Sequence, residues 1–113
     1  MKEIWMPHAG HFIGSRSCLF RLCTYVNGYI ISSVGDYIVN GEVEEIGVHR
    51  THETMVFKAT KNNDTEQKCC PYKMKTPSEI EMVGYSNSTD AVKGHMKLVK
   101  KYKASRPPVI KKK

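Results

Sequence analysis

The histidine and cysteine side chains are the residues of this sequence that most suggest chemistry, because together they offer the ligand types of a zinc site. The histidines form two closely spaced pairs and four thiols accompany them: His8-x-x-His11, His49-x-x-His52, Cys18, Cys23, Cys69 and Cys70. A structural zinc ion needs four such ligands in a tetrahedral array at about 2 Å. However, no C-x-x-C pair occurs, and none of the spacings matches an established zinc finger.

Strand geometry reduces this set of ligands. Cys18 and Cys23 fall in a segment that we expect to be a strand, so they point to opposite faces and do not share an ion. The adjacent Cys69 and Cys70 supply one ligand between them. The remaining set consists of His8 and His11, one of Cys69 and Cys70, and either Cys18 or His95. The alternative is that the cysteines are small buried thiols and the histidines cap elements or lie on the surface. We expect no cofactor, with a small zinc-stabilised domain as the alternative.

Enzymatic catalysis has less support than metal binding. A reactive thiol needs a base within hydrogen-bond reach, and the sequence places no histidine beside a cysteine. The carboxylates of Glu42, Glu44 and Glu45 follow a turn and are typical of a solvated strand edge. The chain has no Walker loop, GxGxxG, GxSxG or HExxH motif. We assign no catalytic residue and favour a non-enzymatic protein, although the sequence leaves this question open.

Positive charge gathers at the C-terminal end of the chain. The net charge is +7, but the first ninety residues hold nine basic against eleven acidic side chains. From Ala91 onward there is no acidic residue and there are nine basic ones: Lys93, Lys97, Lys100, Lys101, Lys103, Arg106, Lys111, Lys112 and Lys113. The protein is therefore expected to combine a nearly neutral body with a strongly cationic end.

These nine cations predict contact with nucleic acid or another acidic partner. Lysines around a helix and in a basic tail neutralise phosphates, which gives salt-dependent binding with little sequence preference. Tyr102 is the only aromatic residue among these lysines, and it belongs to the apolar stripe of the helix. The sequence therefore shows no set of aromatic side chains on which bases would stack. A membrane role for the same segment is disfavoured, because its apolar stripe is narrow.

The competing hypothesis is a protein-binding module in which the neutral body makes the contact. Four large apolar side chains lie in segments that we interpret as loops, where they favour interfaces: Trp5, Met6, Phe12 and Tyr85. For Trp5 and Phe12, packing over one face of the sheet is an alternative role.

Length and composition indicate one domain. With 113 residues, of which 40% are hydrophobic and 26% charged, the chain supports one core but not two. We expect a domain over residues 1–104 and a flexible basic tail over 105–113. No segment approaches the roughly 18 to 20 apolar residues that span a bilayer, and the N-terminal residues lack the apolar region of a signal peptide. The expected compartment is the cytoplasm, where cysteines are thiols or metal ligands.

The clearest local signal is Asn27-Gly28 between two β-prone runs, which predicts a hairpin with a type I′ turn. A two-residue loop fixes the register, with Val26 opposite Tyr29, Thr24 opposite Ile31, Leu22 opposite Ser33 and Phe20 opposite Gly35. A second antiparallel pair is predicted over 43–48 and 54–59, followed by a loop over 60–75 and a short helical turn after Thr76.

The C-terminal helix is predicted to begin after Ser88 or Thr89 and to end near Tyr102. Helical spacing predicts an apolar stripe, with His95 at its border, formed by Val92, Met96, Val99 and Tyr102. The predicted fold class is α+β, with an antiparallel sheet of about four strands arranged as two hairpins, one amphipathic C-terminal helix and a basic tail.

Five segments resemble a group of small uncharacterised proteins from tailed-bacteriophage genomes: 7–13 (PHAGHFI), 21–30 (RLCTYVNGYI), 34–37 (VGDY), 53–57 (ETMVF) and 69–72 (CCPY). The resemblance covers most of the body and stops before the lysine tail. It implies a genomic setting and carries no functional residue with it. Phage accessory proteins of this size often bind nucleic acid or host proteins, some as inhibitors of bacterial defence. The resemblance thus implies residence in the host cytoplasm and a host protein as the alternative partner.

Overall fold

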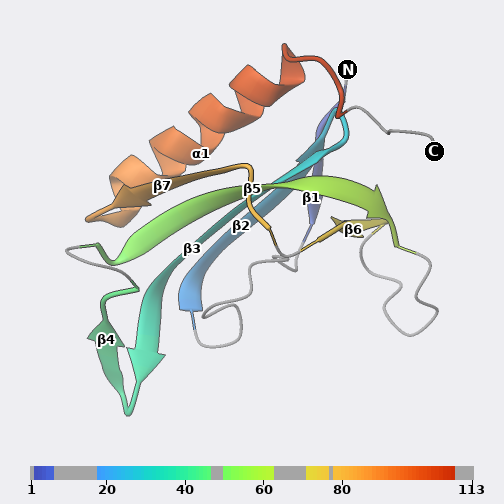
Figure 1. The fold of residues 1–113 in the computed structure, drawn as a ribbon. Coiled ribbons are helices and arrows are strands. Elements are labelled where there is room, and N and C mark those ends of the chain that lie inside the picture. Colours follow the sequence, from blue (N-terminus) through green and yellow to red (C-terminus); the bar gives the residue numbers. More distant parts are fainter. Residues whose placement is uncertain (1, 7–17, 47–49, 63–70, 77, 109–113) are drawn as a thin grey trace.

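The computed structural model describes residues 2–6, 18–46, 50–62, 71–76 and 78–108. The fold is α+β, as predicted: a curled, mostly antiparallel sheet with one helix at its C-terminal end (Figure 1). The strands are β1 (Ile4–Met6), β2 (Cys18–Val26), β3 (Tyr29–Val39), β4 (Glu42–Glu44), β5 (His52–Lys61), β6 (Tyr72–Met74) and β7 (Glu81–Tyr85). The helix α1 spans Ser88–Lys103.

The β2–β3 hairpin forms with the predicted turn and register. Asn27 and Gly28 have φ values of 54° and 86°, as a type I′ turn requires. The four predicted cross-strand pairs are all present, from Val26 opposite Tyr29 out to Phe20 opposite Gly35. The Asn27-Gly28 dipeptide was sufficient for this prediction, because a two-residue turn fixes the register of the strands that it joins.

The prediction of about four strands was too low, and the second hairpin was wrong. The described residues form seven strands, which pair in the order β1-β2-β3-β5-β6, with β4 beside β3 and β7 beside β5. Instead of pairing with each other, the two segments predicted as a hairpin both contribute partners to β3. The missed strands β1 and β6 have only three residues each, too few for an alternating pattern to be recognised. Thr76 precedes β7 rather than a helical turn.

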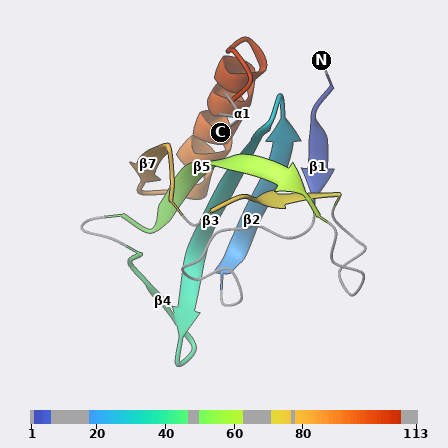
Figure 2. The ribbon, with the colours of Figure 1, turned by 45° about the vertical axis from the view of Figure 1, so that its right-hand side comes forward.

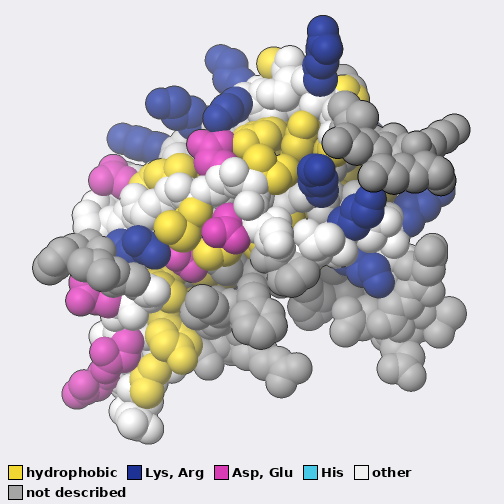
Figure 3. Space-filling model, viewed as in Figure 1, with side chains coloured by type: hydrophobic (Ala, Val, Ile, Leu, Met, Phe, Trp, Pro, Cys, Tyr) yellow, Lys and Arg dark blue, Asp and Glu magenta, His cyan; other side chains and the backbone are white. Residues whose placement is uncertain are grey.

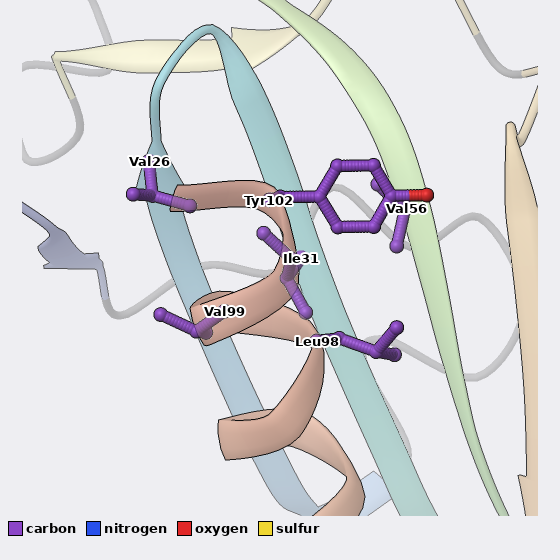
Figure 4. Packing of buried hydrophobic residues seen from close by; sticks show 6 residues of the cluster. All are labelled: Val26, Ile31, Val56, Leu98, Val99 and Tyr102. Carbon is purple, nitrogen blue, oxygen red and sulfur yellow. The ribbon is translucent and has the colours of Figure 1, made fainter. Parts of the chain in front are cut away.

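Two apolar clusters lie on opposite faces of the sheet. Figure 2 shows α1 against one face, while the end of β5 and β6 cross the other. Under the helix, side chains from β2, β3, β5 and α1 form the cluster in Figure 4: Val26, Ile31, Val56, Leu98, Val99 and Tyr102. The second cluster has a buried centre of Met6, Cys23, Ile30 and Phe57. There the Tyr25 and Tyr72 rings stack with their centroids 3.6 Å apart.

The hairpin turn also holds the end of the helix. The Asn27 side-chain amide donates to the carbonyl oxygens of Tyr102, at 3.0 Å, and Ser105, at 2.6 Å. The Tyr29 hydroxyl donates to the Arg106 carbonyl at 2.7 Å. Residues 105–108 therefore lie against the β2–β3 turn, whereas 109–113 fall outside the described residues. In the described residues, no helix is long and apolar enough to cross a membrane.

Candidate nucleic-acid interface

The helix that carries the lysines starts at a well-formed cap. Asn87 is the cap, with an extended backbone, and its side-chain oxygen accepts a hydrogen bond from the Asp90 backbone N–H at 2.8 Å. The sequence had pointed to Ser88 or Thr89 instead, and this was wrong by one or two residues because several cap-forming residues follow one another here. Asp90 lies in the first turn and three lysines lie in the last, in the favourable orientation to the helix dipole.

The face that α1 presents to the sheet differs in part from the predicted stripe. Val99 and Tyr102 are buried as expected, but Val92 and Met96 are 42% and 46% exposed. The buried face is instead completed by Ala91, His95 and Leu98. The error has a chemical reason. A hydrophobicity pattern assigns a histidine to the border, whereas the sheet beneath α1 offers hydroxyl partners that let His95 occupy its centre.

His95 is fully buried within a network of hydroxyl groups. Its Nδ1 lies 2.6 Å from Ser33 Oγ and its Nε2 lies 2.8 Å from Thr24 Oγ1, while Ser33 also bonds Thr54. Burial lowers the pKa of His95 from 6.5 to about 4, so the imidazole is neutral near pH 7. All four side chains have no solvent exposure. This Ser–His contact is thus part of the packing between helix and sheet, and a substrate does not reach it.

The five lysines of α1 fall into two groups. Lys101 Nζ donates to Glu81 Oε1 of β7 at 2.8 Å, and Lys103 Nζ donates to Oε2 of Glu3, just before β1, at 3.1 Å, so both lysines are paired with carboxylates. The Lys101 contact lowers the pKa of Glu81, to which Tyr102 adds a hydrogen bond, and the Lys103 contact lowers the pKa of Glu3. In contrast, Lys93, Lys97 and Lys100 are exposed and have no partner among the described residues.

We call Lys93, Lys97 and Lys100 the lysine ridge, because a spacing of four and three residues aligns them on the outer side of α1. Figure 3 shows blue lysine and arginine side chains along the outer edge formed by α1, with magenta acidic ones directly below them and further down toward the β3–β4 hairpin. Arg106 is exposed just beyond the helix. Lys111, Lys112 and Lys113, which the sequence assigned to the same surface, lie outside the described residues.

A pocket of about 500 Å³ opens beside the ridge, between α1 and β7. It is lined by Val83 and Leu98, by Tyr85, Gly94 and Glu81, and by two lysines, Lys97 and Lys101. Gly94 leaves room for the Tyr85 ring, because a Cβ at this position would collide with the Tyr85 hydroxyl unless that ring moved. The sequence placed Tyr85 in a loop before the helix. The pairing of β7 with β5 brings Tyr85 next to Lys97 and Lys101. No local sequence pattern predicts that pairing.

Comparisons with known proteins identify no relative of this chain. No family model matches the chain, and neither a curated protein nor a solved structure does.

The residues predicted to bind zinc are not assembled by the described structure. His8, His11, Cys69 and Cys70 lie outside the described residues. Of the remaining pair, Cys18 is buried at the start of β2, whereas His95 bonds Thr24, six residues or about 20 Å further along that strand. Both nitrogens of His95 are already engaged, so Cys18 and His95 do not share an ion. Within the described ranges, no three histidine, cysteine or acidic side chains come together as metal ligands.

Neither of the two described cysteines forms a disulfide. Cys18 and Cys23 are both buried and point to opposite faces of β2, as the register predicted. Burial raises the pKa of the Cys18 thiol, which makes it a poor nucleophile.

Proposed function

We propose that this chain is a non-enzymatic accessory protein of the tailed-phage type that binds nucleic acid through the lysine ridge. The observation that carries this proposal is the division of the helical lysines. Glu81 and Glu3 neutralise Lys101 and Lys103, whereas the three ridge lysines are exposed and have no carboxylate partner among the described residues. Their charge is available to phosphates.

The ridge suits a phosphate backbone because it is linear and fixed at both ends. Lys93 and Lys97 are about 6 Å apart along the helix axis, and Lys100 lies about 4.5 Å further. Asn87 caps one end of the helix, and Asn27 bonds the other. Long side chains on this rigid helix reach successive phosphates without reading base sequence.

The neighbouring pocket favours a single strand over a duplex. Its wall combines the Tyr85 ring with the apolar Val83 and Leu98, and Lys97 belongs to both pocket and ridge. A base that is unpaired can enter such a pocket while its phosphate contacts Lys97, whereas a base inside a duplex cannot. Contacts between a base and an aromatic side chain contribute about 1–3 kcal/mol each.

The full-length protein is therefore expected to bind a labelled single-stranded oligonucleotide of twelve nucleotides more tightly than an abasic strand of the same length. We expect a factor of about 5 to 150, the equivalent of one base contact. The measurement is fluorescence anisotropy, with a duplex as a third ligand.

The salt dependence of the affinity is a second readout of the same experiment. Affinity for every one of these strands should fall steadily as salt rises from about 50 to 300 mM, because phosphate contacts release counterions. An affinity that does not change over this range would refute the electrostatic proposal. Equal affinity for normal and abasic strands would mean that the ridge binds the strand and that no base enters the pocket.

A second candidate function is inhibition of a host bacterial protein, such as a defence factor. The observation that favours it is the exposure of large apolar side chains around the helix. Trp5 is 46% exposed, and Val92 and Met96 follow one another on one flank of α1. The Trp5 ring lies 5.3 Å from that of His95, which adjoins Met96 in the helix. Exposed aromatic and methionine side chains are enriched in protein interfaces.

The two functions separate in a capture experiment from bacterial lysate treated with nuclease. If the apolar flank binds a host protein, one specific protein should be retained by the wild type and lost with the double variant Val92→Gln and Met96→Gln. It should be kept when the three ridge lysines are changed to glutamine. Retention by both variants, or loss only with the ridge variant, would argue against this second function.

A further inference from the structure

His52 is a buried histidine with one ring nitrogen left without a hydrogen bond. It is the first residue of β5, is only 3% exposed, and its Nδ1 lies 2.8 Å from the Thr51 hydroxyl. Its Nε2 is buried and has no hydrogen-bond partner. Buried polar atoms are nearly always paired in folded proteins, so an unpaired imidazole nitrogen calls for a specific explanation.

The unpaired nitrogen faces a carboxylate. Asp36 Oδ2 lies 3.6 Å from His52 Nε2. That distance is too long for an N–H···O hydrogen bond, which spans about 2.7–3.2 Å. It does match the separation of two ligands around one metal ion. With bonds of about 2.0–2.2 Å and tetrahedral to trigonal angles, ligand atoms lie roughly 3.3–3.7 Å apart.

The backbone around Asp36 holds its carboxylate beside the His52 ring. Asp36 has φ of 50°, in the left-handed region, and lies where β3 changes partner from β5 to β4. The neighbouring Gly35 makes room for the imidazole, because a Cβ there would lie 2.0 Å from His52 Cδ2. Phe20 contacts the same ring edge-on, at 5.1 Å between centroids. A strained backbone that holds two donor atoms together is common at functional sites.

We propose that His52 Nε2 and the Asp36 carboxylate bind a divalent transition metal such as Zn²⁺. Thr51 fixes the imidazole: when Nδ1–H donates to the Thr51 hydroxyl, Nε2 carries the lone pair that a metal requires. Imidazole with carboxylate is a donor set that zinc accepts. Since the Asp36 side chain is 40% exposed, water completes the coordination. The metal is held where the β3–β4 hairpin leaves the sheet.

The test is a titration of the full-length protein with ZnCl₂, followed by long-range ¹H–¹⁵N NMR of the histidine rings. In the metal-free protein we expect the His52 proton on Nδ1, and on titration we expect the His52 Nε2 resonance to shift with saturation. Zinc at ten times its dissociation constant should raise the Tm by about 5 °C.

Two variants make the result specific. Asp36→Asn removes the charge but tolerates the left-handed backbone, and it should weaken zinc binding at His52 at least tenfold. Glu44→Gln removes the same charge from the exposed β4 and should leave binding unchanged. A proton found on Nε2, or zinc that shifts only other histidines, would overturn the proposal, as would equal binding in the Asp36 variant. These readouts do not depend on whether the ridge binds nucleic acid.

Discussion

Lowering the pH from 7.5 to 5.0 is expected to cost the folded protein about 2 kcal/mol of stability through His95 alone. The pKa of His95 is about 4 in the folded state and near 6.5 when unfolded. Between these values the unfolded chain takes up a proton that the folded protein does not. Stability from this residue is thus complete above the unfolded pKa and decreases as the pH falls toward 4, where the loss reaches about 3 kcal/mol.

The surroundings of His95 explain why it resists the proton. Its ring contacts are the Thr24 and Ser33 hydroxyls and the Trp5 ring, and desolvation is the cause of its lowered pKa. The carboxylate of Glu81 does not obscure this effect. Its lowered pKa contributes stability that is lost only as the pH falls below the ordinary value of 4.5.

Urea unfolding at pH 7.5 and 5.0 measures this loss, and His95→Gln is the comparison. Glutamine retains a donor and an acceptor for the two hydroxyls but does not titrate. The variant should therefore lose about 2 kcal/mol less than the wild type over the same pH interval, whatever its absolute stability. If both proteins show the same pH dependence, ionisation of another group is responsible.

Changing Lys93, Lys97 and Lys100 together to glutamine is expected to lower the affinity for a single-stranded oligonucleotide about 100-fold at 0.1 M salt. Each phosphate contact with a single strand contributes about 0.7 to the slope of log K against log salt. Losing three contacts should therefore reduce that slope by about 2. Glutamine forms helices nearly as well as lysine, and the circular dichroism spectrum should not change.

A second triple variant controls for net charge. Lys61, Lys73 and Lys75 are exposed at the end of β5, in β6 and directly after β6, away from the helix. Their replacement by glutamine lowers the formal charge by the same three units. We expect a much smaller loss of affinity, and a slope close to that of the wild type. An equal loss in both variants would mean that overall charge, rather than the ridge, binds the strand.

The β2–β3 hairpin was predictable because its information is local. Asn27-Gly28 determines the turn, the turn determines the register, and the register separates Cys18 from Cys23. The same dipeptide at Asn40-Gly41, with φ values of 53° and 82°, connects β3 to β4. The sequence predicts a turn at Asn40-Gly41 as well, but its pattern assigned 43–48 to the strand over 54–59 as a partner, whereas the three-residue β4 pairs with β3.

The sequence by itself determined the α+β class, the central hairpin, the existence of a C-terminal helix and the gathering of cations there. Only the tertiary structure decided how that helix is rotated, which lysines are neutralised and which groups meet His52. These outcomes depend on partners distant in sequence: Glu81 and Glu3 for the lysines, Thr24 and Ser33 for His95. Periodicity reports one element at a time. It therefore cannot show that a polar histidine belongs in the core, or that Tyr85 lies beside the ridge.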